Sequence, residues 1–287
     1  MHLSHLTMFG RNARRVATQA SCYGRAARRA TTQASCYPHG SPRRGPLLCQ
    51  ESGLPVDMAL LAAETELVAL PELDGLKLHL ITHACRLYHS NGFRECPFPA
   101  PWWAFCWPGS YCIARHLQQH PELVRGKRVL DFAAGGGPAA LVAARCGAAH
   151  VVCNDVCAWA LASCQLNAAA NGITIPRSPP ANAAAAAFAE EDLVLEDLVG
   201  NTAVGGTFDV ILAGDIMYEQ PLAGYVTDWL REMAAQGTEV LLGDPGRAFL
   251  PTDGLQQVAE FDLPGPHVRD SSNGLHTGQV WKVAPSV

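Results

Sequence analysis

The chain has 287 residues, 48% of them hydrophobic and 16% charged, and a formal net charge of −5. This length and composition suit one α/β domain with a full-sized core. No run of 18 apolar residues occurs and the eleven cysteines have no C-x-x-C spacing, so we expect neither a membrane span nor a metal site.

The first 50 residues differ in composition from the rest of the chain. They hold eight arginines, no lysine and no acidic residue, which leaves 13 basic and 26 acidic residues for the remainder. This composition is typical of an organelle transit peptide, and the preference for arginine favours the mitochondrial matrix over a plastid. Gly10–Tyr23 and Gly24–Tyr37 are a repeat, identical at eleven of fourteen positions. Two polar copies are too few for a solenoid, so we predict a disordered leader; a basic nucleic-acid-binding arm is the alternative.

Residues 51–127 are predicted to be an N-terminal extension. Helical spacing over Met58–Leu70 predicts a helix that stops at Pro71. Alternation over Leu76–Leu80 predicts a strand with one buried face. An aromatic stretch, residues 98–109, follows, and Ser110 is predicted to cap a helix that runs to about His120.

From residue 128 to 287, predicted strands and helices alternate, which favours a parallel sheet with ligands at the carboxyl edge of its strands. Residues 173–190, a proline followed by a polyalanine tract, are predicted to be a surface insertion. The predicted strands are 128–132, 150–155, 192–196, 208–213, 239–242, 258–262 and 279–283, and the predicted helices are 138–146, 158–170 and 222–235.

The stretch from Val129 to Ala140 carries the strongest signal for a ligand. An apolar strand ends on a carboxylate, enters a glycine cluster and opens a helix, whose N-terminus offers backbone N–H groups. A second apolar strand ends on Asp155, and an acid at this position can hold a ribose diol. The pair predicts a nucleoside-cofactor site.

The identity of the cofactor is less certain from the loop alone. Gly135-x-Gly137-x-x-Ala140 satisfies the dinucleotide fingerprint, with Asp155 near the expected distance. Asp131, however, would face the two negative charges of a pyrophosphate. S-adenosylmethionine carries a sulfonium and an amine instead, so charge complementarity favours this methyl donor.

Carboxylates end four predicted strands: Asp131, Asp155, Asp215 and Asp244. Several acids at one sheet edge usually mark a site, because a buried acid is costly. The alternative is that they cap the helices that follow, and Asp131 in particular can simply orient its loop.

At this point the chain resembles the class I, seven-β-strand protein lysine methyltransferases, over roughly residues 70–283. The likeness is carried by several short blocks, and the last of them points to the branch that acts on the electron transfer flavoprotein β subunit. Ala133 departs from the pattern, since it stands where the first loop glycine is usual. The blocks are Leu70–Leu73, Pro101–Gly109, Arg125–Asp131 with its loop, Asn154–Asp155, Gly214–Tyr218 and Gly243–Arg247.

The resemblance implies a Rossmann-like α/β fold: a seven-stranded, mostly parallel sheet with helices on both faces. It implies S-adenosylmethionine as donor, no metal, and a protein substrate, with a monomer favoured. Asp215 and Tyr218 would face the acceptor lysine as catalytic residues, and Asp215 would also contact the donor. The other donor-binding residues would be Trp107, Asp131, Ala133, Gly135, Gly137, Asp155 for the ribose, and Asp197 for the adenine.

The chemistry agrees with these roles, since methyl transfer needs a neutral amine and lysine has a pKa of about 10.4. Trp102, Trp103 and Trp107 could wall the cation, or pack in the core. Arg247 could recognise acidic substrate surface or pair with Asp244. The rival functions are a methyltransferase for a ribosomal protein or a small amine, a nicotinamide-binding protein, and a non-catalytic module of the same fold.

Overall fold

The computed structural model describes residues 56–89, 97–98, 101–173, 193–194, 197–272 and 274–285. The predicted leader and most of the predicted insertion lie outside these residues. The helices are α2 (Met58–Ala63), α3 (Pro108–Gln119), α4 (Pro138–Arg145), α5 (Ala158–Ala170) and α6 (Leu222–Ala235). The strands are β1 (Glu66–Leu70), β2 (Leu76–Leu80), β3 (Arg128–Phe132), β4 (His150–Asn154), β5 (Leu193–Val194), β6 (Val210–Gly214), β7 (Glu239–Asp244), β8 (Leu255–Asp262) and β9 (Thr277–Val283).

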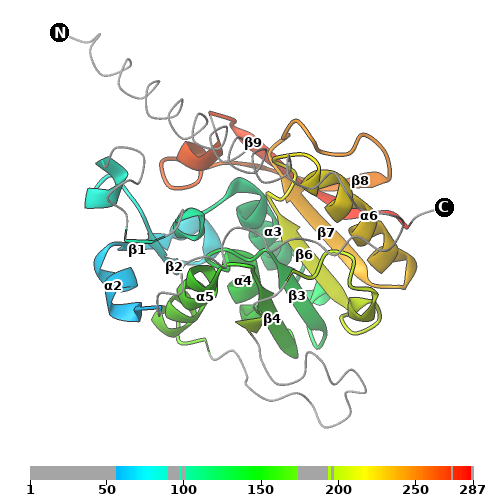
Figure 1. Cartoon of the computed structure of the whole chain (residues 1–287), viewed down its shortest axis with the longest axis horizontal. Coiled ribbons are helices and arrows are strands. Elements are labelled where there is room, and N and C mark those ends of the chain that lie inside the picture. Colours follow the sequence, from blue (N-terminus) through cyan, green and yellow to red (C-terminus); the bar gives the residue numbers. More distant parts are fainter. Residues whose placement is uncertain are drawn as a thin grey trace, which may run out of the picture.

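The main sheet has seven strands in the order β5-β4-β3-β6-β7-β9-β8 (Figure 1). The five strands from β5 to β7 in this order are parallel, and β9 pairs antiparallel with both β7 and β8. This confirms the predicted seven-stranded, mostly parallel α/β fold. The chain runs outward from β3 to β5 and then restarts at β6 on the other side of β3. Such a switch point opens a crevice at the carboxyl ends of the strands, where ligands of open α/β sheets bind.

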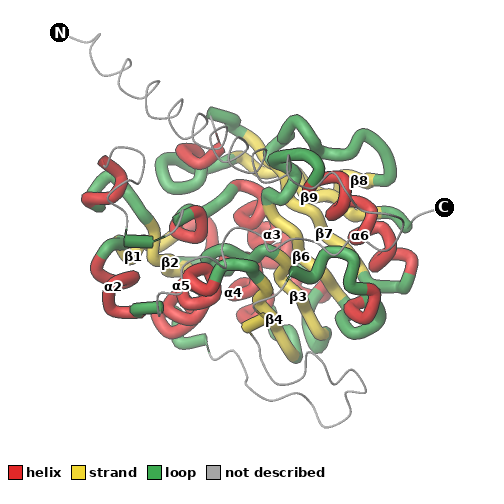
Figure 2. The backbone as a smooth tube through the Cα atoms, in the orientation of Figure 1, coloured by secondary structure: helices red, strands yellow, loops and turns green. Residues whose placement is uncertain are grey.

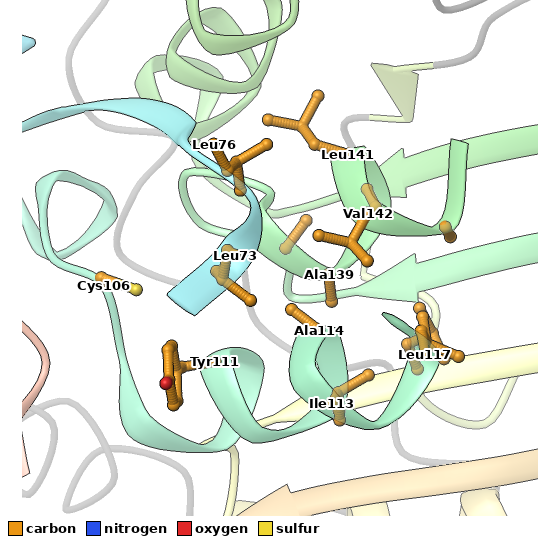
Figure 3. Close-up of a cluster of buried hydrophobic side chains, with 14 of the residues drawn as sticks. Leu73, Leu76, Cys106, Tyr111, Ile113, Ala114, Leu117, Ala139, Leu141 and Val142 are labelled. Carbon is orange, nitrogen blue, oxygen red and sulfur yellow. The ribbon is translucent and has the colours of Figure 1, made fainter. Parts of the chain in front are cut away.

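Helices cover both faces of the sheet, as predicted (Figure 2). One hydrophobic cluster joins α3, α4 and α5 to one face, and a second joins α6 to the other face through Val226, Trp229 and Met233. Figure 3 shows Ala114 of α3 beside Ala139 of α4, in the first of these clusters. Because that cluster also holds side chains from β1 and β2, the predicted extension shares a core with the sheet.

The region Met58–Leu70 differs from the prediction. It is a short helix, α2, followed by strand β1, which pairs antiparallel with β2. Asp57 accepts hydrogen bonds from the backbone N–H groups of Ala59 and Leu60, so it caps α2. In β1 the buried Val68 and Leu70 alternate with an exposed residue, and pairing with β2 outweighs the helical spacing.

The remaining predicted boundaries agree closely with the structure. Strand β3 and helices α5 and α6 have the predicted bounds. Strand β8 begins three residues earlier than predicted, at Leu255, because pairing with β9 extends to that point. Such edge pairing leaves most of β8 exposed, and its sequence therefore lacks a continuous apolar run.

Candidate active site

Four carboxylates lie at the carboxyl edge of the sheet, as the sequence predicted. Asp131 is the penultimate residue of β3, Asp155 follows β4, Asp215 follows β6, and Asp244 ends β7. These strands are parallel neighbours, so their carboxyl ends share one edge. The glycine loop lies at this edge too, because it connects β3 to α4.

The glycine loop is tied to Asp155. The Asp155 carboxylate accepts hydrogen bonds from the backbone N–H of Gly135, at 3.0 Å, and from that of Cys157, at 2.9 Å. Burial raises the pKa of Asp155 to about 6, and the backbone hydrogen bonds oppose this rise. Asp155 is therefore ionised at neutral pH. A carboxylate can accept about four hydrogen bonds, which leaves capacity for hydroxyl groups of a ligand.

Residues beneath the loop hold it in a single conformation. Cys164 donates from its thiol to the carbonyl of Gly135, and Asn167 donates to the carbonyl of Gly136. Gly137 has a φ of 75°, and an added Cβ there would lie 2.8 Å from the Cys164 sulfur. This glycine is therefore required both by its backbone angle and by the close approach of α5.

Ala133 departs from the family pattern at a position where glycine is favoured. Its φ is 54°, which is in the left-handed region. A residue with a Cβ pays about 1–2 kcal/mol in this region. The backbone at Ala133 therefore makes the same left-handed turn that glycine would make, and the cost in stability is offset by interactions elsewhere in the fold.

Asp131 is buried and faces α4. Its carboxylate accepts a hydrogen bond of 3.0 Å from the backbone N–H of Ala140, in the first turn of that helix. Burial, with a smaller contribution from the charge of Asp155, raises the pKa of Asp131 to about 7, although the Ala140 hydrogen bond opposes the rise. This contact orients the loop and the helix. Direct contact between Asp131 and the donor stays a prediction.

The N-terminus of α3 docks on Asp215. The backbone N–H groups of Gly109 and Ser110 both donate to Oδ2 of Asp215. The prediction that Ser110 caps α3 is therefore wrong. The helix begins at Pro108, Ser110 lies inside its first turn, and a carboxylate from another element satisfies the unpaired donors.

Glycines make this docking possible. An added Cβ at Gly109 would lie 2.2 Å from the carbonyl oxygen of Gly243, and one at Gly214 would lie 2.2 Å from Oγ of Ser110. The helix backbone thus touches the ends of β6 and β7 directly. These contacts give a physical reason for the glycines in three of the sequence blocks, namely Gly109, Gly214 and Gly243.

Arg247 completes the surroundings of Asp215. Its Nε and Nη2 donate to Oδ1 of Asp215 at 3.1 Å and 2.5 Å, and its guanidinium lies 5.6 Å from the ring centroid of Trp107. The side chain therefore pairs with Asp215, not with Asp244 as one alternative had it. Burial raises the pKa of Asp215, while the Arg247 charge and the hydrogen bonds from Arg247, Gly109 and Ser110 lower it.

Asp244 shapes the turn that carries Arg247. Its Oδ1 accepts hydrogen bonds from the backbone N–H groups of Gly246 and Arg247, at 2.7 Å and 2.6 Å. Its Oδ2 is buried and has no hydrogen-bond partner among the described residues. Burial raises the pKa of Asp244 to about 6, with a further contribution from Asp215.

The tryptophans fall into two environments. Trp103 is buried and packs edge-on against Phe98, so it belongs to the core. Trp102 and Trp107 are half-buried, with ring centroids 6.2 Å apart, and the Trp107 indole donates to the carbonyl of Trp102. Of the three tryptophans in this stretch, Trp102 and Trp107 are the two that are partly exposed.

Tyr218 and Asp197 lie on the surface. Tyr218, three residues after Asp215, is half exposed. Asp197 is exposed, follows β5, and accepts a hydrogen bond of 3.1 Å from the backbone N–H of Val199. Its predicted contact with adenine stays a prediction.

Two supports of the loop were missed from the sequence. Asn167 and Cys164 lie on α5, and their side chains reach back to the loop carbonyls. The only signal in the sequence was their spacing of three residues on a predicted helix, which places them on one face. Among the described residues, no cluster of histidine, cysteine and acidic side chains could hold a metal ion, and no helix there is long and apolar enough to cross a membrane.

Comparison with known proteins agrees with this geometry. Residues 105–197 match the model of the methyltransferase small domain. The chain is 34% identical over 234 residues to the electron transfer flavoprotein beta subunit lysine methyltransferase of Rattus norvegicus, which covers 79% of this chain and 84% of the relative. The chain belongs to this family. It is a methyltransferase of class I fold.

Two further likenesses complete the comparison. The methyltransferase of the same name from Danio rerio is 34% identical over 76% of this chain and 80% of its own length. Among solved structures, the magnesium protoporphyrin IX methyltransferase of Synechocystis PCC 6803 with bound SAM is 13% identical, with a TM-score of 0.41 over 62% of this chain and 78% of that one.

Proposed function

We propose that this protein transfers methyl groups from S-adenosylmethionine to lysine side chains of the electron transfer flavoprotein β subunit. The observation that carries the proposal is the single sheet edge at which the glycine loop, Asp155, Trp107 and Asp215 meet, in a chain whose relatives bear that name.

The residues fit the methyl donor better than a dinucleotide. The stretch from Asp131 to Ala140 contains one acidic residue, Asp131, and no basic residue, and the carboxylate of Asp155 is hydrogen-bonded to its loop. A pyrophosphate would meet repulsion there, whereas a sulfonium and an amine would meet attraction. When bound, the donor supplies an electrophilic methyl group on sulfur. Asp155, already oriented by two backbone N–H groups, accepts from the ribose hydroxyls.

The acceptor side of the site is formed by Asp215, Tyr218 and Trp107. The half-exposed Tyr218 and Trp107 are accessible to a lysine that arrives from solvent, and the ring of Trp107 can contact a cation through its face. Asp215 holds the first turn of α3 and the Arg247 guanidinium in place beside the incoming amine. Holding the amine in line with the methyl group supplies most of the acceleration, because displacement needs little covalent help from the protein.

The leader supports a location in the mitochondrial matrix. An arginine-rich, acid-free segment of 50 residues precedes the described structure. Fusing residues 1–50 to a fluorescent protein tests this location: import into mitochondria is expected, and a fusion that stays outside them would contradict it. Expression of the same fusion in cells that contain plastids distinguishes import into mitochondria from import into plastids.

Intact-mass measurement tests the activity. The recombinant chain is incubated with S-adenosylmethionine and recombinant β subunit, and the β subunit should gain the mass of one or more methyl groups. Asp253→Ala, at an exposed carboxylate away from the sheet edge, is the matched control and should retain full activity. A β subunit of unchanged mass would refute this substrate. A mitochondrial lysate labelled with radioactive donor would then identify another protein or small amine as the acceptor.

A further inference from the structure

Arg247 is held at three points, which fix both its backbone and its side chain. The backbone N–H donates to Asp244, two guanidinium nitrogens donate to Oδ1 of Asp215, and the guanidinium lies over the ring of Trp107. Its side chain is only 16% exposed. A side chain with this many partners is immobile, and a guanidinium keeps its charge at every relevant pH.

The position of this charge has a chemical consequence. Asp215 is the carboxylate that the acceptor amine would meet, and Arg247 already neutralises it. An isolated carboxylate would hold the incoming lysine as an ammonium, whose lone pair is occupied by a proton. A carboxylate paired with a guanidinium lacks that preference, and the nearby cation disfavours a second positive charge.

We propose that Arg247 is a positioning residue for methyl transfer: a fixed cation that, through Asp215, favours the neutral form of the acceptor lysine. The inference rests on the proposed function, since it requires a lysine acceptor at this edge. The ammonium gives one proton to solvent, the amine lone pair forms the new N–C bond, and the electron pair of the broken S–C bond stays on sulfur. The product is a methylated ammonium ion.

The other titratable groups near Asp215 keep constant charges in the alkaline range. Asp244 has a pKa of about 6 and is anionic above it. Burial and the charge of Asp215 raise the pKa of the Cys106 thiol to about 12, and burial raises that of Cys112 further. Burial raises the pKa of Glu219, on the loop after β6, above its ordinary value. The same profile is measured in the Tyr218→Phe variant, which lacks the phenol group.

The test is the pH dependence of the single-turnover methylation rate, from about pH 7 to about pH 10.5, in the full chain. In the wild type the half-maximal rate should fall well below the ordinary lysine pKa of about 10.4. In Arg247→Gln this midpoint should rise by about one unit or more, whereas Arg247→Lys, which keeps the charge, should stay near the wild type. Arg231→Gln is the matched control, because Arg231 pairs with Asp253 on the surface and should leave the midpoint unchanged.

A second acceptor separates the charge effect from a structural one. A β subunit that carries aminoethylcysteine at the target position offers an amine of lower pKa than lysine. It should restore the rate of Arg247→Gln at neutral pH. It should have a smaller effect on the wild type, whose acceptor is already neutral in larger part.

Several results would overturn the inference. A wild-type midpoint at the ordinary lysine pKa would do so even if Arg247→Gln does not fold. So would an unchanged midpoint in a folded Arg247→Gln variant, or a Lys variant shifted as far as Gln. A rise in the KM for the donor without a shifted midpoint would assign Arg247 to donor binding instead. Failure of the proposed function is distinguishable, because the wild type would then not methylate the β subunit at any pH.

Discussion

Gly109→Ala should destabilise the protein strongly, although alanine is normally the better helix residue. The added Cβ would lie 2.2 Å from the carbonyl oxygen of Gly243 and 2.6 Å from Oδ2 of Asp215. Both neighbours are held in place, one by the sheet and the other by Arg247. Overpacking costs about 1–3 kcal/mol, and weakening a charge-assisted hydrogen bond adds about 1.5–3 kcal/mol. Helix propensity returns at most about 1 kcal/mol. We expect a net loss of about 2–4 kcal/mol.

Gly224→Ala is the matched control, because Gly224 also lies in a helix and has room for a methyl group. The nearest atom to its added Cβ is Oε1 of Gln220, at 3.4 Å, on a flexible side chain. This variant should be more stable by about 0.5–1 kcal/mol. Chemical denaturation, followed by circular dichroism, measures both changes. A Gly109→Ala variant as stable as the wild type would refute the proposed docking of α3 on Asp215.

The other predictions concern the carboxylates and Tyr218. The pKa of Asp131 in the folded protein, about 7, lies above its ordinary value of 3.8. The stability that the protonated Asp131 side chain contributes below pH 3.8 is therefore lost as pH rises through this window. Asp131→Asn does not titrate, so it should become more stable relative to the wild type between about pH 4 and about pH 7.5. The relative gain in the free energy of unfolding is at most about 4 kcal/mol. Chemical denaturation of both proteins at the two pH values measures it, and a difference between them that does not change with pH would refute the prediction. Asp155→Asn should weaken donor binding about tenfold or more in calorimetry, with a retained melting temperature; unchanged affinity would remove Asp155 from the donor site. Tyr218→Phe should lower turnover more than donor affinity, and an equal loss in both would place Tyr218 on the donor side.

The sheet and its acid-bearing edge could be predicted from the sequence because each signal there is local. A buried parallel strand is a short apolar run, so β3, β6 and β7 were recognised along with the carboxylates at their ends. Helices α5 and α6 were found because their apolar spacing is uninterrupted. The edge then follows from topology alone, since parallel strands place their carboxyl ends together.

Contacts between distant residues could not be predicted in the same way. The partner of Gly109 and Ser110 lies more than a hundred residues away, at Asp215, and nothing in either segment names the other. The predicted cap at Ser110 was wrong for this reason, and of the two alternatives for Arg247 the pairing with Asp244 does not hold, since the side chain binds Asp215. In both cases a nearby residue offered a plausible partner, and the fold supplied a more distant one.

The strand-end acids serve the fold and the site at the same time. Asp215 accepts from the first turn of α3, Asp131 from the first turn of α4, and Asp155 from Cys157, the residue that precedes α5. All three helices that cover this face therefore begin on a carboxylate from the sheet, where their dipoles favour negative charge. Capping and ligand binding, which the sequence left as alternatives, are compatible at Asp131 and Asp155, whose carboxylates have more acceptor sites than their helices use, whereas the four hydrogen bonds that Asp215 accepts come from α3 and Arg247. Alanine substitutions at these positions would confound a lost ligand contact with a lost cap. Asparagine keeps an acceptor oxygen for the helix and removes the charge, so it isolates the chemical role.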